Sequence, residues 1–309
     1  MDERFSRPLA AALLLATGTV FAGESDDRPD GGKRLGQLRE MVEYYADSGF
    51  GNMKRQYNAF KGYVDRGEGE TLANALLREA QENAAGTNET QRARFQFAVA
   101  WLDDFGRTNA LPFLLERMKR EDFKGLAVDE MPDERRRPVE CFFRIANRNK
   151  ATDALHAAAE MLSDARWSWM RDELYRAATQ ILELHEASDR LKVAKAGGGV
   201  VNLRAVREPI CGFLAECYEN ETAPERFAFL DGFIRSKLPE WKSSERRLQG
   251  AERMLRLHPE SKAASGVVRS VQDARNAQPA GGTAPVQPGD PSDTEIVEPL
   301  PAGWADFQY

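Results

Sequence analysis

Residues 145–163 have the sequence IANRNKATDALHAAAEMLS. Apolar residues recur at steps of three and four on both sides of a polar break at Asn149 and Lys150, which is typical of two helices joined by a short turn. So short a connection forces the helices to lie antiparallel and in contact, because no slack is left to place them elsewhere. We therefore expect Leu155 to open the second helix of a helix–turn–helix unit.

The same unit recurs further along the chain. Leu191, Phe227 and Val267 take the place of Leu155 in later units, and the four residues are separated by 36, 36 and 40 positions. Leu111 marks an earlier unit, 44 positions before Leu155. This recurrence predicts an all-α fold, a right-handed α-solenoid of stacked antiparallel helix pairs. Solenoids mostly present binding surfaces rather than reactive groups.

Helical periodicity also fills the chain before these units. Leu35 to Tyr45, Met53 to Val64 and Leu72 to Ala80 each mark a helix, and a fourth runs to Gly106. Asn88 and Gln91 form a plausible capping box for the fourth helix. Short polar turns are expected within the later pairs, at Arg107–Asn109, Asn149–Lys150, Ser188–Asp189, Glu221–Thr222 and Pro259–Ser261.

Two prolines give a second mark of register. Pro138 and Pro209 lie 17 and 18 positions before Leu155 and Phe227, early in the first helix of a pair. Two-helix units of about forty residues with an occasional proline in the first helix resemble the HEAT and armadillo class of helical repeats. Tetratricopeptide repeats are the runner-up, since their strict period and Trp/Leu-Gly signature are missing. The resemblance implies protein or peptide binding along a concave face.

The first 22 residues resemble a secretory signal peptide. Arg4 and Arg7 precede an apolar run from Leu9 to Leu15 that is too short to span a bilayer, and Val20-Phe21-Ala22 suits a signal-peptidase site. We expect a mature chain that starts at Gly23 and is periplasmic or secreted, without stable membrane insertion. The alternatives are an uncleaved anchor or a buried helix. Residues 23–33 then form a flexible linker and residues 34–277 the helical repeat domain.

The last segment, residues 278–309, is rich in Pro, Gly, Ala and Thr and contains no Lys or Arg. Such a composition predicts a disordered acidic tail. Its aromatic residues Trp304, Phe307 and Tyr309 are candidates for partner binding or for docking onto the protein's own groove. A merely solubilising tail is the alternative.

The formal charge of −6 comes almost entirely from this tail. Five of the 49 acids lie in the tail and two in the signal segment, so residues 23–277 hold 42 acids against 41 bases. A nucleic-acid-binding protein usually carries a basic excess, because phosphate contacts supply most of its affinity. The sequence therefore favours a protein or peptide partner and no nucleic acid.

Catalytic motifs are mostly incomplete. His185-Glu186 lacks the second histidine of a zinc-protease helix, and Gly197-Gly198-Gly199 lacks the residues of a phosphate-binding loop. We expect no cofactor and no metal. The acidic pairs Asp103-Asp104 and Asp129-Glu130 leave open an alternative, an exported all-α enzyme that acts on glycans with two carboxylates.

The three cysteines, Cys141, Cys211 and Cys217, are expected to be buried free thiols. Cys211 and Cys217 are about 9 Å apart along one predicted helix, too far for a disulfide. Intermolecular pairing or redox chemistry is the alternative.

The best surface candidate is the helix at residues 53–64. Its aromatic residues Tyr57, Phe60 and Tyr63 recur every third position beside basic residues that include Lys54 and Lys61. Aromatic side chains flanked by bases could bind a peptide, an acidic partner or the protein's own tail, whereas an apolar stripe at helical spacing also suits a core. The sequence thus predicts an exported, non-catalytic binding scaffold or adaptor.

Overall fold

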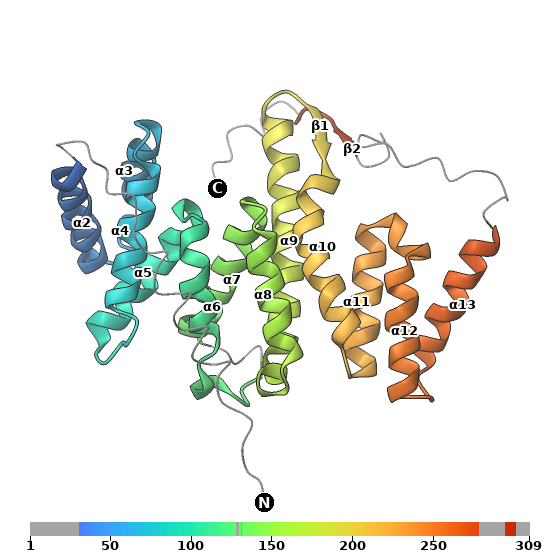
Figure 1. Ribbon diagram of the computed structural model, residues 1–309. Helices are drawn as coiled ribbons and strands as arrows, with labels where there is room; N and C mark the ends of the chain where they lie inside the picture. Colours follow the sequence, from blue (N-terminus) through green and yellow to red (C-terminus); the bar gives the residue numbers. More distant parts are fainter. Residues whose placement is uncertain (1–30, 128–129, 131, 278–293, 301–309) are drawn as a thin grey trace, which may run out of the picture.

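The computed structural model describes residues 31–127, 130, 132–277 and 294–300 (Figure 1). The predicted signal peptide, most of the predicted linker and the tail aromatics Trp304, Phe307 and Tyr309 lie outside these residues. Residues 31–33, assigned above to the linker, belong to the first helix. No helix in the described part of the chain combines the length and the apolar character that crossing a membrane requires.

The protein is all-α in class, as predicted, with one short two-stranded ribbon. The helices are α2 (Gly31–Ser48), α3 (Met53–Asp65), α4 (Gly69–Glu82), α5 (Glu89–Phe105), α6 (Leu111–Met118), α7 (Asp133–Arg148), α8 (Thr152–Ser163), α9 (Arg171–Lys195), α10 (Leu203–Asn220), α11 (Pro224–Lys237), α12 (Glu245–Leu257) and α13 (Lys262–Ala277). Short 3-10 turns lie at Thr108–Ala110, Glu121–Phe123, Ala165–Met170 and Pro239–Ser243. The strands are β1 (Gly199–Asn202) and β2 (Thr294–Val297).

Local sequence explains where these helices begin. The Asn88 side chain accepts a hydrogen bond from the backbone N–H of Gln91 at 2.9 Å, which satisfies a free donor at the start of α5. Gln91 in turn accepts from the backbone N–H of Thr87, one residue before the cap. The predicted capping box is thus present in a shifted form. Pro224 sits in the first turn of α11, where its missing N–H costs nothing.

The helices lie side by side in one extended row from α2 to α13 (Figure 1). Several helices that follow each other in the chain contact one another, as in α4 with α5, α9 with α10 and α12 with α13. Helices two places apart also touch, as in α5 with α7, α7 with α9, α8 with α10 and α11 with α13. Each helix therefore buries its apolar side mainly against near neighbours in the chain.

One predicted helix boundary is wrong. Ser188 and Asp189 were expected to form a turn before Leu191, but α9 continues without a break from Arg171 to Lys195. Asp189 lies on a solvent-facing side of the helix and pairs with Lys192 at 2.9 Å. Two polar residues on an exposed helix face have the same sequence pattern as a two-residue turn. The chain reverses only at Gly197–Gly199, so Leu191 is not equivalent to Leu155.

One continuous apolar core runs from Leu38 in α2 to Val271 in α13. Cys141, Cys211 and Cys217 are free thiols within it, as predicted. Burial raises the pKa of all three thiols, for Cys211 to about 12. Both predicted prolines, Pro138 and Pro209, lie inside helices, α7 and α10.

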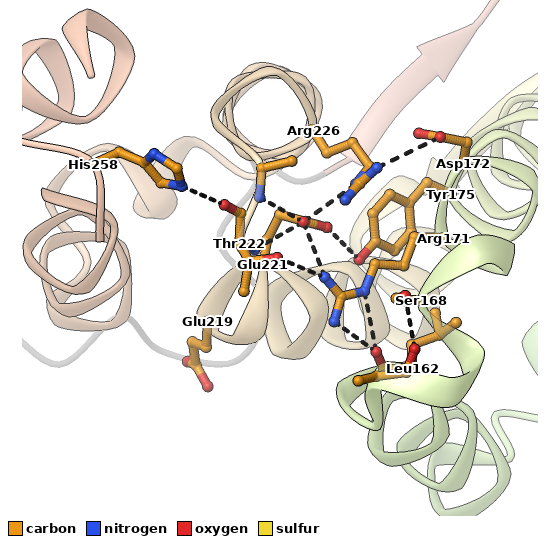
Figure 2. A network of polar contacts seen from close by, with 12 residues as sticks. Leu162, Ser168, Arg171, Asp172, Tyr175, Glu219, Glu221, Thr222, Arg226 and His258 are labelled. Atoms are coloured by element: carbon orange, nitrogen blue, oxygen red, sulfur yellow. Dashed lines mark hydrogen bonds and ion pairs between the residues drawn. The ribbon is translucent and has the colours of Figure 1, made fainter. Parts of the chain in front are cut away.

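The turn between α10 and α11 holds a fully buried carboxylate, Glu221 (Figure 2). Its bonding partners are the backbone N–H groups of Thr222 and Ala223, the Tyr175 hydroxyl and the guanidinium groups of Arg171 and Arg226. Burial acts to raise the pKa of Glu221, but the backbone donors and the two arginines outweigh it and lower the pKa. Because both carboxylate oxygens are engaged, we assign this network to joining α9 to the α10–α11 turn.

Candidate functional site

The predicted surface on α3 is only partly a surface. Phe60 is completely buried and packs edge-on against Trp101 of α5, with ring centroids 5.2 Å apart. Tyr57 is 43% exposed and also leans on Trp101 and on Phe105. The aromatic stripe therefore serves mainly to pack α3 on α5, and Phe60 cannot contact a partner.

The other candidates on α3 are not fully buried, although Tyr63 packs against the core, and their side chains do not share one site. Tyr63 is half-buried under the guanidinium of Arg66, 4.4 Å from its ring centroid. Lys61 forms an ion pair with Asp65 at 2.7 Å, and Lys54 is exposed. Tyr63, Lys61 and Lys54 line neither of the two cavities described below.

The acidic pair Asp103-Asp104 does not form a cleft with two facing carboxylates. Asp103 and Asp104 are adjacent on α5, and Arg144 of α7 lies 3.4 Å from Asp103. Burial raises the pKa of Asp103 to about 6. The two residues line neither of the cavities described below. Asp129 of the second pair lies outside the described residues, and Glu130 caps the backbone N–H of Ala127.

A different feature stands out at the end of the α9–α10 hairpin: a segment of the C-terminal tail is added to it as a strand (Figure 1). β2 pairs antiparallel with β1, with Val200 opposite Ile296 and Val201 opposite Glu295. Composition predicted disorder throughout residues 278–309, so this four-residue strand is a correction. The strand also lies on α9 and α10.

Three consecutive glycines, of which Gly199 is the first residue of β1, lie where the tail strand approaches the hairpin. Gly197, Gly198 and Gly199 have φ values of 95°, 88° and 153°, which residues with a side chain rarely adopt. A Cβ atom on Gly198 would lie 2.8 Å from the carbonyl oxygen of Val297 and 3.1 Å from Pro299 Cδ. A Cβ atom on Gly197 would meet nothing within 4 Å. Gly198 is therefore the residue that permits close approach of the tail backbone.

Charged side chains on α9 hold the tail strand β2 in place. Arg190 Nε lies 2.6 Å from Glu295 of β2, and its Nη1 lies 3.9 Å from Glu186. Glu186 also accepts from Arg207 and Lys237 at 2.6 and 3.0 Å. Burial acts to raise the pKa of Glu186, but these hydrogen bonds outweigh it and lower the pKa. Arg190 is thus held between one buried acid of the scaffold and one acid of the tail.

The two faces of the ribbon differ. Val201 is 4% exposed and faces the helices, whereas Val200 and its cross-strand partner Ile296 are 59% and 81% exposed. A cross-strand apolar pair on the outer face stabilises the pairing modestly. The ribbon therefore rests on backbone hydrogen bonds, one buried valine and one ion pair.

A cavity of about 460 Å³ adjoins β1. We call it the β1 cavity. It is lined by Asn147, Arg148, Lys150, His185, Ser188, Asp189, Lys192, Val193, Val200, Val201, Asn202, Ala205 and Val206. A second cavity of about 530 Å³ lies among α6, α7 and α8 and is mostly apolar, with Leu111, Leu115 and Phe142 in its wall. The β1 cavity differs in joining a valine wall to a wall of polar and basic side chains.

His185 lies in the polar wall of the β1 cavity. Burial and the charges of Arg144 and Arg148 lower its pKa to about 4, so the imidazole is neutral at pH 7. Its Nδ1 lies 2.7 Å from Asn147 Nδ2. His185 thus belongs to a half-buried polar cluster.

Sequence reasoning missed β1, β2 and Arg190 as parts of a site. A signal for the strands was present: Val200-Val201 follows three glycines, and Thr294-Glu295-Ile296-Val297 is rich in β-branched residues and lies between Pro291 and Pro299. Nothing in the sequence pairs the two segments.

In the described part of the chain, no group of three or more His, Cys, Asp or Glu side chains is arranged to hold a metal ion. The chain matches no protein-family model, no curated protein and no solved structure.

Proposed function

We propose that this chain is an exported, non-catalytic scaffold that binds extended segments of partner proteins as an added strand beside β1. The helices would form a right-handed, HEAT-like α-solenoid of stacked antiparallel pairs. Contacts between helices one and two places apart support this arrangement, because solenoid units contact mainly their neighbours.

One observation carries the binding proposal: the segment Thr294–Val297 pairs with β1 although residues 278–293 separate it from α13. Strand addition uses backbone hydrogen bonds for affinity, so it accepts many sequences, and side-chain contacts supply preference. Here the contacts favour an acid opposite Arg190 and a backbone that can approach Gly198 closely. The expected ligand is a short, extended, acidic and apolar peptide.

Export is part of the proposal and rests on residues 1–22. A signal peptide followed by a chain without further membrane-spanning sequence leads to a periplasmic or secreted protein. Expression of the whole gene followed by N-terminal sequencing of the exported fraction tests this. A mature N-terminus at or near Gly23 supports export, and full-length protein retained inside the cell overturns it.

Peptide binding is tested with the chain's own segment as the probe. A protease site inserted between Gly281 and Gly282 allows the tail to be cut after the protein has folded and then removed by gel filtration. The labelled peptide DPSDTEIVEPL, residues 290–300, should bind the cut protein in a fluorescence anisotropy titration. It should bind the uncut protein more weakly, because a tethered competitor acts at millimolar effective concentration.

Two glycine variants provide a matched control. Gly198→Ala and Gly197→Ala strain the backbone equally through their positive φ, but only the first places a Cβ atom against the tail. Binding should be lost in Gly198→Ala and kept in Gly197→Ala. A Glu295→Lys peptide should bind two- to fivefold more weakly, since it loses a surface ion pair worth about 0.5–1 kcal/mol. Equal binding to cut and uncut protein, or equal loss in both glycine variants, overturns strand addition at β1.

A further inference from the structure

Asn147 and His185 form a polar pair in the wall of the β1 cavity. Asn147 of α7 is 6% exposed, and its Nδ2 lies 2.7 Å from Nδ1 of His185 on α9. The Oδ1 atom of Asn147 is buried and has no hydrogen-bond partner among the described residues. Buried side-chain amides normally have partners at both ends, because a missing partner costs free energy. The pair therefore needs a further hydrogen-bonding group.

The kind of group that completes the pair does not depend on the orientation of the Asn147 amide. With Nδ2 donating to His185 Nδ1, the neutral imidazole carries its proton on Nε2, so Nε2 donates and Asn147 Oδ1 accepts. With the amide reversed, His185 Nδ1 donates to Oδ1, Nε2 accepts and Nδ2 of Asn147 donates. In both cases the pair presents one donor and one acceptor. A ligand that bonds to both must itself carry an acceptor beside a donor.

The opposite wall of the cavity suits an apolar body. Four valine side chains line it: Val193, Val200, Val201 and Val206. The volume of about 460 Å³ lies within the range of small-molecule sites. Such sites combine apolar walls with a few polar groups that fix the orientation of the ligand. The valines and the Asn147–His185 pair provide these two parts.

The charges around the cavity are largely balanced. Asp189, the acid in the wall, pairs with Lys192 at 2.9 Å. Arg148 interacts with the carboxylates of Asp103–Asp104 on α5. Lys150 is exposed, so water screens its charge. An ionised ligand would lose hydration here without gaining a buried counter-charge, whereas a neutral ligand would not. The wall therefore favours a neutral ligand.

We propose that the β1 cavity binds a neutral small molecule that has an apolar body and an amide-type edge, in which a hydrogen-bond donor lies beside an acceptor. The edge bonds to Asn147 and His185, and the apolar body lies against the four valines. Aromatic carboxamides and nucleobases share this chemistry. The site does not depend on strand addition, since the described residues that line it include none from β2.

Fluorine NMR titration of the full chain at pH 7 tests the proposal, with 4-fluorobenzamide and 5-fluorouracil as probes. At least one probe should bind saturably, and the tighter one assigns the ligand to carboxamides or to nucleobases. If neither binds saturably, the proposal is overturned and a water molecule is left as the partner of the pair.

Two relatives of the first probe isolate the edge. 4-Fluoroacetophenone keeps the acceptor and lacks the donor, and 4-fluorobenzoate is an anion with acceptors alone. If 4-fluorobenzamide binds, both should bind about fivefold more weakly, since one hydrogen bond contributes about 1 kcal/mol. Benzoate binding as tight as that of the amide would mark an anion site, and equally tight acetophenone binding would mark a merely apolar one. Either result contradicts the proposal.

Variants locate the bound probe. Asn147→Leu should weaken amide binding about fivefold, because it removes the hydrogen bond at nearly constant volume. Ala205→Trp fills the β1 cavity and should abolish binding. The matched control is Ala154→Trp, since Ala154 is also half-buried but lines the second cavity alone of the two. It should bind as the parent chain does.

Circular dichroism checks that each tryptophan variant folds. Should Ala205→Trp fail to fold, Ser188→Trp fills the same cavity from an exposed position in its wall. Equal loss of binding in the β1-cavity variant and in Ala154→Trp overturns the assignment, as does loss in Ala154→Trp alone.

The outcome is separable from that of the proposed function. Saturable probe binding that Ala205→Trp removes, without binding of the peptide DPSDTEIVEPL to the cut protein, leaves this inference intact and removes the partner-binding proposal. Binding of that peptide without binding of either probe has the opposite meaning.

Discussion

Replacing Asp103 by Asn should stabilise the protein at neutral pH, although the change removes one partner of an ion pair. Burial raises the pKa of Asp103 from 3.8 to about 6, in spite of the Arg144 guanidinium 3.4 Å away. The folded state therefore binds this proton more tightly than the unfolded state. Between pH 3.8 and 6 it carries more bound protons, so the stability contributed by this group falls as the pH rises through that window.

The size of the effect follows from the same two pKa values. A difference of 2.2 between 6 and 3.8 corresponds to about 3 kcal/mol at about 1.36 kcal/mol per pH unit. This is an upper value, because the Asp103 side chain is 25% exposed and water screens part of the cost. Asn has nearly the shape of protonated Asp and stays neutral. The variant should match the parent chain below pH 4 and exceed it by as much as about 3 kcal/mol at pH 7.

Urea unfolding followed by circular dichroism at pH 4, 5, 6, 7 and 8 gives this difference directly. Other titrating groups cancel when the two proteins are compared at each pH. Asp273→Asn, an exposed position on α13, serves as the control and should stay within about 0.5 kcal/mol of the parent chain. The reasoning is refuted if Asp103→Asn is less stable than the parent at pH 7, or if its advantage is the same at every pH.

Three further predictions have defined outcomes. His185→Gln should make the free energy of unfolding depend less on pH on the acid side. The folded pKa of His185 is about 4 and lies below 6.5, so this group contributes up to about 3 kcal/mol above pH 6.5 and loses that contribution as the pH falls towards 4. Urea unfolding at pH 4 and 7 measures the difference. Gly250→Ala should lower the free energy of unfolding by more than about 2 kcal/mol, because the new Cβ would lie 2.3 Å from the buried Tyr218 ring. Gly266→Ala meets nothing within 4 Å and should raise the free energy of unfolding by about 0.5–1 kcal/mol in the same assay. Cys141, Cys211 and Cys217 should fail to react with Ellman's reagent in the native state and react fully in urea, since burial keeps each thiol protonated and covered; fast native reaction of any of them contradicts this.

Periodicity predicted the helices well because most of them bury one side against their neighbours. The apolar stripe of α3 is an example: its spacing fits a helix, and Phe60 at its centre is fully buried. The same spacing cannot say which aromatic residues remain outside, because that depends on where Trp101 of α5 lies. The sequence therefore placed Phe60 correctly on a helix but left its role open between a surface and the core, and Phe60 lies in the core.

The turn positions were harder to predict than the helices. A turn is recognisable when a residue must adopt a conformation that ordinary side chains avoid, and Gly197–Gly199 meets this condition with three positive φ values. Ser188 and Asp189 are only polar, and polar residues suit an exposed helix face equally well. The turn at Asn149–Lys150 was predicted correctly although it contains no glycine. Lys150 has a positive φ there and is the one non-glycine residue with a positive φ in the described part of the chain.

The site was missed because its parts are joined only in three dimensions. A four-residue strand has too few residues to outweigh the Pro- and Gly-rich composition around it, and its partner lies about ninety positions earlier. Such a short pairing is weak by itself, since an isolated two-stranded ribbon is at best marginally stable. Its persistence here depends on the tether, on Arg190 and on the missing side chain of Gly198. If β1 binds partners as proposed, the tail sets a threshold: only a strand that pairs with β1 better than a tethered competitor at millimolar effective concentration displaces it. The Gly198→Ala variant adds one methyl group and should remove the bound tail and the partner site together. It therefore separates this arrangement from one in which the tail and the partner use different surfaces.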